Sequence, residues 1–111
     1  AEDLVLAAAA MAARGLAPGL LIGHSLGGAA VLAAAGRMPS VRAVATLAAP
    51  ADPAHVLHNF AGDLPRIAAD GVAEVSLGGR MIAIGRDFVD DVTRGAPLEA
   101  VSGLRRALLV M

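Results

Sequence analysis

The 111-residue sequence contains no cysteine, tryptophan or tyrosine, and phenylalanine occurs only at Phe60 and Phe88. The absence of cysteine excludes disulfide frameworks, thiolate metal sites and a cysteine nucleophile. With so few aromatic side chains, the core must be built from Ala, Leu, Val, Ile and Met. Because alanine buries little apolar area, we expect only marginal stability for this chain in isolation.

Charged residues are also few, at 17% of the sequence. The formal net charge is −1, and the basic residues are scattered along the chain. A nucleic-acid-binding surface would need clustered positive charge, so no nucleic-acid partner is expected. The apolar segment Leu4–Ala13 follows two acidic residues and ends at Arg14, with Pro18 close behind. It has the wrong charge for a signal peptide and is too short for a membrane span, so we expect no membrane partner and, by default, a cytoplasmic location.

The sequence Gly23-His24-Ser25-Leu26-Gly27-Gly28 joins two segments of different character. The apolar run Leu20–Ile22 precedes it and has the composition of a strand, whereas the small apolar run Ala29–Ala33 follows it and favours a helix. Gly-x-Ser-x-Gly between a strand and a helix is the pattern of a nucleophile elbow. We therefore predict that Ser25 stands at a sharp strand-to-helix turn.

The glycines of this pattern have a steric explanation. Side chains at Gly23 or Gly27 are expected to collide across the turn, and Gly28 is expected to permit close packing. The helix that starts after Ser25 would present unpaired backbone N–H groups to a developing oxyanion. The N–H of Leu26 is the expected donor.

With this context the sequence resembles the α/β-hydrolase family. The resemblance implies an α/β fold class, a partial α/β-hydrolase fold with parallel core strands, flanking helices and a helix-plus-hairpin cap insertion. It also implies an esterase-type serine hydrolase in which Ser25 attacks a small-molecule acyl ester and forms an acyl-enzyme. No cofactor and no metal are expected.

The family resemblance further implies an acid and then a histidine downstream of the serine. The segment Ala107–Met111 resembles a buried parallel strand after which that acid would follow, and no histidine occurs after His58. We therefore expect the chain to be a fragment of one hydrolase domain, inactive alone, with the remainder outside it. The second oxyanion donor would be missing, and one edge of the strand Leu20–Ile22 would be unpaired.

Within that domain we expect three parts: elbow and core strands over 1–50, a cap insertion over 51–104 and a returning core strand over 105–111. A second core strand is predicted at Val41–Leu47. The expected elements of the insertion are helices at Ala54–Ala61 and up to Ala69, a hairpin at Ala73–Gly85, and helices at Asp87–Thr93 and Leu98–Leu104. Its candidates for an apolar acyl-binding wall are Val56, Leu57, Phe60, Phe88 and Val89.

The order of several segments is similar to a bacterial subgroup of hydrolase domains, some of which are fused to an osmotically induced, peroxide-handling domain. The segments that carry this likeness are Ala49–Val56, the hairpin, Phe88–Asp91 and Leu108–Met111. A fused peroxide-handling domain would need cysteines, so that half is not in this sequence.

Four other polar side chains have competing interpretations. His24 neighbours the serine but is expected to shape the elbow rather than act as the base. His55 and His58 share a helix face and could bind a metal with Asp52, although solvent-facing or pocket-lining roles explain them better. Asp52 is a possible catalytic acid, and we favour a helix cap because Asp-Pro is a common helix start.

Two alternatives to an esterase stay open at this stage. A thioesterase or acyltransferase would share the serine ester step, and the sequence does not separate transfer to water from transfer to another acceptor. A noncatalytic hydrolase-like binding domain would keep the elbow only as architecture.

Overall fold

The computed structural model describes residues 1–95 and 97–111, and the chain divides into two compact units. The first unit combines residues 1–51 with the C-terminal segment from 97 onward, and the second comprises residues 52–95. None of the helices in the described ranges is long and apolar enough to cross a membrane.

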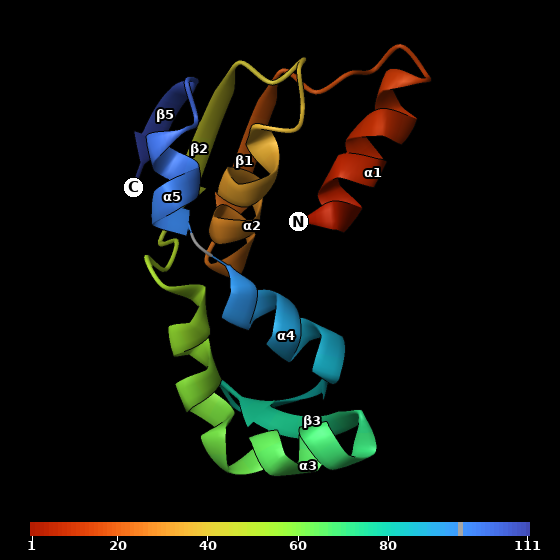
Figure 1. The fold of residues 1–111 in the computed structure, drawn as a ribbon, viewed down its shortest axis with the longest axis vertical. Coiled ribbons are helices and arrows are strands. Elements are labelled where there is room, and N and C mark those ends of the chain that lie inside the picture. The colour runs from red at the N-terminus through yellow and green to blue at the C-terminus, as the bar shows by residue number, and fades with distance from the viewer. Residues whose placement is uncertain (96) are drawn as a thin grey trace. The chain divides into compact units, whose positions relative to one another are not determined.

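A parallel sheet organises the first unit, with strand order β1-β2-β5 (Figure 1). Its strands are β1 (Leu20–His24), β2 (Ala43–Leu47) and β5 (Ala107–Val110). Helix α2 (Leu26–Ala35) packs on β1 and β2, and α1 (Glu2–Ala12) and α5 (Pro97–Ser102) pack on α2. The expected α/β class, with parallel strands flanked by helices, is confirmed.

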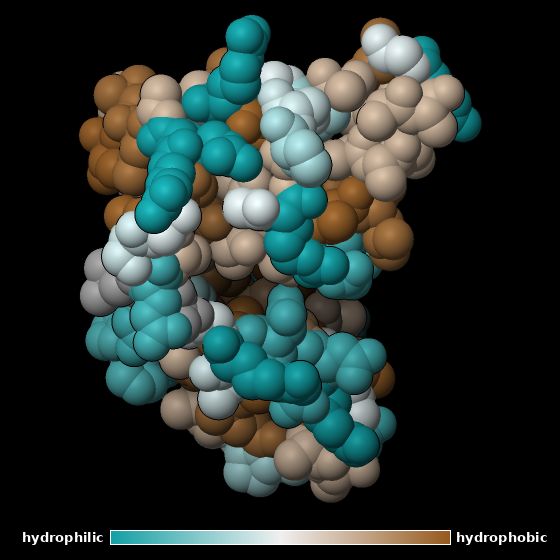
Figure 2. All heavy atoms as spheres, turned by 45° about the horizontal axis from the view of Figure 1, so that its top comes forward, coloured by the Kyte–Doolittle hydropathy of each residue, from teal (hydrophilic) through white to brown (hydrophobic). Residues whose placement is uncertain are grey.

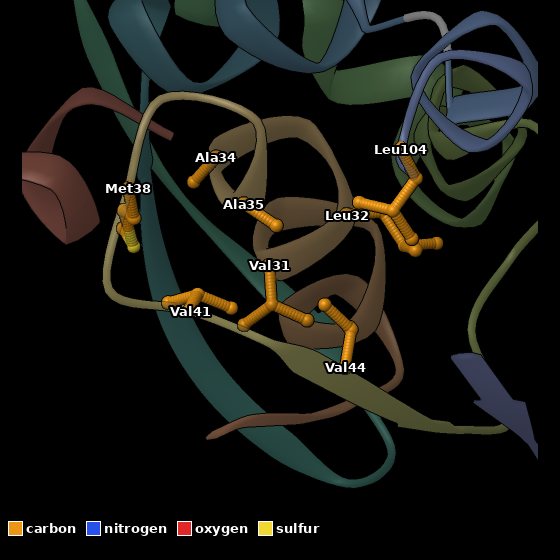
Figure 3. Packing of buried hydrophobic residues seen from close by; sticks show 8 residues of the cluster. All are labelled: Val31, Leu32, Ala34, Ala35, Met38, Val41, Val44 and Leu104. Atoms are coloured by element: carbon orange, nitrogen blue, oxygen red, sulfur yellow. The ribbon is translucent and has the colours of Figure 1, made fainter. Parts of the chain in front are cut away.

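The core of the first unit lies between α2 and one face of the sheet. Figure 3 shows Val31 of α2 directed toward Val41 and Val44, while Leu32 lies beside Leu104. Ala34 and Ala35 have no solvent-exposed surface. Their small side chains allow α2 to approach its neighbours closely, so the core is compact despite its lack of aromatic residues.

Helix α1 is joined to the first unit by an apolar stripe and an ion pair. Leu4, Val5 and Ala8 recur at helical spacing and pack against the core cluster. At the start of the helix, both Glu2 carboxylate oxygens accept hydrogen bonds from Arg37, at 2.6 and 3.2 Å. This hydrogen bonding, with the charge of Arg37, lowers the pKa of Glu2.

The opposite face of the sheet is largely exposed. Leu20, Ile22 and Leu109 retain 53%, 64% and 54% of their accessible surface. The prediction of a buried strand over 107–111 is therefore wrong in burial, although β5 is parallel as predicted. An apolar composition shows that a strand can be buried. The strand is buried only where another helix or sheet packs on its face. Within the described residues β1 pairs only with β2, as expected for an open edge.

The second unit contains a hairpin and three short helices. Strands β3 (Val72–Leu77) and β4 (Arg80–Gly85) pair antiparallel, and Gly78 and Gly79 have φ of +56° and +78° between them. The predicted hairpin and its glycine turn are confirmed, since tight hairpin turns require positive φ. The helices are the 3₁₀ helix η1 (Pro53–Asp63), α3 (Leu64–Asp70) and α4 (Arg86–Arg94).

The hairpin and helices of the second unit enclose a separate core. Phe60 is only 4% exposed and packs with Ile67 and Val75. Three further candidates for the acyl-binding wall are partly buried against the same cluster: Leu57, Phe88 and Val89. Phe60 therefore belongs to the interior of this unit and offers almost no surface to a substrate.

The boundary of the second unit differs from the predicted insertion, which extended to residue 104. The compact unit ends at Gly95, because α5 packs on α2 and Leu104 joins the core of the first unit. The interpretation of residues 51–104 as a cap insertion stays a prediction.

Leu32→Ala should lower the free energy of unfolding by about 2–5 kcal/mol, because it leaves a cavity in the first core. Leu109→Ala is the matched control, and its exposed side chain should give a change within about 1 kcal/mol. Urea unfolding followed by circular dichroism measures both. If the two variants lost equal free energy of unfolding, the described position of the core would be contradicted.

The ion pair between Glu2 and Arg37 should make the free energy of unfolding depend on pH. Because the folded state lowers the pKa of Glu2, the stabilisation is present above its ordinary value of 4.5 and is lost as the pH falls through the lower folded value. Glu2→Gln should therefore differ from wild type at pH 7 in low salt and much less at pH 3 or in about 1 M salt. Urea midpoints test this, with Asp3→Asn as the control for the first-turn charge. A Glu2→Gln difference that persists at pH 3 would rule out the ion pair as its cause.

Candidate active site

Ser25 stands between the last residue of β1 and the first residue of α2. Its φ is +54° and its ψ is −128°, outside the common regions for a residue with a side chain. Such a conformation costs about 1–3 kcal/mol and persists only where the surrounding structure enforces it. Ser25 is also exposed, so this turn presents its side chain to solvent.

The hydroxyl of Ser25 does not cap the helix that follows it. Serine at this position commonly accepts a hydrogen bond from the second or third helical N–H through its side chain. Here the backbone carbonyl of Ser25 accepts from Gly28 N at 2.8 Å and from Ala29 N at 3.4 Å, and the side chain makes no cap hydrogen bond. The capping role therefore does not explain why this residue is a serine.

Two backbone N–H groups that directly follow Ser25 in the chain have no acceptor among the described residues. They belong to Leu26 and Gly27, the first two residues of α2. The N-terminus of a helix carries a partial positive charge, which favours a developing negative charge nearby. The arrangement can thus donate hydrogen bonds to an oxyanion, and Leu26 is the residue directly after the serine, as expected for the donor.

The backbone of the turn is closely packed at Gly23 and Gly28. A Cβ at Gly23 would collide with the carbonyl oxygen of Gly27 and lie 2.6 Å from the nitrogen of Gly28. A Cβ at Gly28 would lie 2.5 Å from the Cβ of Ala49. The predicted steric requirement is therefore present at these two glycines.

The corresponding prediction for Gly27 is wrong. A Cβ there would meet no atom within 4 Å, apart from its chain neighbours and the nearby backbone of its own helix. Gly27 is exposed at the second position of α2, and although its carbonyl group lies against Gly23, the direction in which its own Cβ would point is open. The motif spacing identifies both flanking glycines, and only the tertiary contacts distinguish them.

The strand ends next to Ser25 are tied together by backbone hydrogen bonds. Ser25 N donates to Leu47 O at 2.8 Å, and Ala48 N donates to Met111 O at 2.7 Å. Ala48 has a φ of +48°, an uncommon value for alanine, and Ala49 lies against Gly28. Sequence reasoning missed both alanines, because hydrophobic periodicity gives no signal for a small residue that is required by a close contact.

The histidines of the sequence are all exposed. His24 ends β1, and the rings of His55 and His58 in η1 contact each other edge to face, with centroids 4.5 Å apart. Within the described ranges, no group of three or more His, Asp or Glu side chains is arranged to hold a metal ion.

Asp52 caps the helix that begins after it. Its Oδ1 accepts a hydrogen bond from Ala54 N at 3.0 Å, and Pro53 occupies the first helical position. The favoured interpretation of Asp52 as a cap is confirmed. Its alternative role as a catalytic acid stays a prediction.

Neither the protein-family models nor the curated proteins that were compared with the sequence gave a match. Among solved structures, the chain is similar to the esterase domain from a Rhodothermus marinus protein. The two are 45% identical with a TM-score of 0.75, over 98% of this chain and 45% of that one. This chain therefore spans less than half the length of that domain, and it has the α/β fold of a partial esterase-like hydrolase.

The glycines of the turn should differ in their tolerance of alanine. Gly23→Ala and Gly28→Ala should each cost about 1–3 kcal/mol of stability, because the added methyl overlaps packed atoms. Gly27→Ala should be neutral or stabilising by up to about 1 kcal/mol, since alanine is the better helix former. Thermal or urea unfolding of the three variants measures the difference. The described packing would be wrong if Gly27→Ala were the most damaging of the three.

Proposed function

We propose that the chain carries the nucleophile segment of an α/β-hydrolase of esterase type, and that Ser25 attacks the carbonyl carbon of a small-molecule acyl ester. The observation that carries the proposal is the positive-φ turn at Ser25, with an exposed hydroxyl that does not cap α2. The similarity to an esterase domain at 45% identity supports the same conclusion.

The proposed reaction follows the usual course of serine ester hydrolysis. The Oγ of Ser25 forms a bond to the carbonyl carbon while a general base takes its proton. The resulting oxyanion accepts a hydrogen bond from the N–H of Leu26. Collapse of the tetrahedral intermediate breaks the bond to the alkoxy group, which leaves as an alcohol with that proton, and water then hydrolyses the acyl-enzyme to an acid and free Ser25.

The backbone around Ser25 would prepare this step before substrate binds. The hydrogen bond from Ser25 N to Leu47 O and the close packing at Gly23 and Gly28 restrain the turn. A donor that is already oriented needs no reorganisation as the oxyanion forms, and removing one such donor in other hydrolases costs about 10²–10³ in rate. This is the contribution that the described residues would make to catalysis.

The base is assigned to a histidine outside this chain, as the family resemblance implies. His24 is consecutive with Ser25 at a strand end, where successive side chains diverge, so we do not assign the base to it. We accordingly propose esterase activity for the complete protein and none for the 111-residue chain alone.

A fluorophosphonate probe tests the proposal, because it phosphonylates only an activated serine. The complete protein should be labelled at Ser25, as located by peptide mass spectrometry, and the 111-residue chain should not. Ser25→Ala should abolish labelling, whereas the control Ser76→Ala, at an exposed serine of β3, should leave it unchanged. A folded complete protein without label at Ser25 would rule out the nucleophile and favour a noncatalytic binding domain.

A further inference from the structure

A second candidate site lies in the first unit, at the end of the sheet opposite Ser25. A shallow cavity of about 450 Å³, largely open to solvent, lies where β2 and β5 begin and is lined by Pro39, Val41, Arg42, Arg105, Arg106 and Ala107. In Figure 2 this end of the first unit comes forward, and hydrophilic side chains gather there beside the hydrophobic edge formed by β5. Ser25, in contrast, follows the carboxyl end of β1.

The sheet register brings two of the arginines together. Arg42 directly precedes Ala43 and Arg106 directly precedes Ala107, and these two alanines are paired between β2 and β5. The N–H of Ala107 donates to the carbonyl oxygen of Arg42 at 3.2 Å, so the backbones are joined at this point. Like charges on adjacent strands repel each other unless a counter-charge lies nearby.

No counter-charge lies among the described residues that line the cavity. Its lining contains no Asp or Glu, and none of the three arginines forms an ion pair within the described part of the chain. The Nε of Arg106 is buried without a hydrogen-bond partner in that part, while its Nη1 donates to Arg105 O at 3.3 Å. A buried charged donor without an acceptor is unfavourable, so the Arg106 guanidinium is not fully compensated within the described residues.

We propose that this cavity binds the phosphate group of a small, non-aromatic phosphate ester. Arginine forks match the oxygens of phosphate, and three positive charges suit a dianion better than a single carboxylate. The volume lies within the range of about 300–1,000 Å³ that is typical of small-molecule sites, which leaves room beyond the phosphate. The lining has no aromatic side chain to stack on a nucleobase.

Arg105 fits this assignment. Its φ is +44°, an uncommon conformation for a residue with a side chain, and it lines the cavity from the segment that joins α5 to β5. Strained backbone at such a position is frequently retained where a side chain must be presented to a ligand. The proposal does not depend on the activity of Ser25, because the two sites lie at opposite ends of the strands.

Calorimetric titration of the 111-residue chain with glycerol 2-phosphate, inorganic phosphate and acetate tests the site. Glycerol 2-phosphate should bind saturably with one molecule per chain, inorganic phosphate more weakly, and acetate at least about tenfold more weakly, since a monoanion pairs less well with three cations. Arg106→Gln and Arg42→Gln should each weaken phosphate-ester binding by about tenfold or more. The control Arg14→Gln, at an exposed arginine outside the cavity, should change it less than about twofold.

The absence of saturable phosphate binding would overturn the proposal, as would an equal effect of Arg14→Gln. Acetate binding as tight as that of the ester would overturn the assignment to phosphate. Circular dichroism establishes which variants are folded. Arg106→Lys, which keeps the charge and loses the fork, should still weaken binding and serves in place of Arg106→Gln if that variant unfolds.

Discussion

The close approach of α2 to the end of β1 is the constraint on which the candidate active site depends. The chain leaves the strand and enters the helix within one residue, which places Ser25 at a φ of +54°. This turn is possible because Gly23 and Gly28 lie against backbone and against Ala49, where a methyl group would overlap other atoms. The strain at Ser25 is thus maintained by packing on both sides of the turn.

The same packing explains the alanine-rich composition of the first unit. Ala34 and Ala35 are completely buried in the core cluster, and their small side chains allow α2 to lie close to its neighbours. The larger side chains of Val31 and Val44 then fill the remaining space between helix and sheet (Figure 3). An aromatic side chain on this face of α2 would push the helix outward and disturb the turn.

The local features of the fold could be predicted from the sequence. Alternation and paired glycines predicted the hairpin around Gly78 and Gly79, and Asp52-Pro53 predicted a capped helix, because these signals arise from the backbone preferences of a few adjacent residues. The position of Ser25 between a strand and a helix followed in the same way. Each of these patterns lies within about ten consecutive residues, so it can be read without knowing which distant segments pack against it.

The features that sequence reasoning missed depend on contacts between distant segments. The open space beside Gly27, the uncovered face of β5 and the contact of Ala49 with Gly28 are set by what packs against each residue. The cluster of Arg42 with Arg106 arises only through strand pairing across more than sixty positions of sequence. Scattered charges in a sequence therefore do not exclude a concentrated charge in the fold.

The assignment of Ser25 as a nucleophile is tested most directly by a crystal structure of the complete protein after reaction with a phosphonate. The account predicts phosphorus bonded to Ser25 Oγ and a phosphonyl oxygen within hydrogen-bond distance, about 2.7–3.1 Å, of the backbone nitrogen of Leu26. A structure with unmodified Ser25, or with the phosphonyl oxygen directed away from the start of α2, would contradict it.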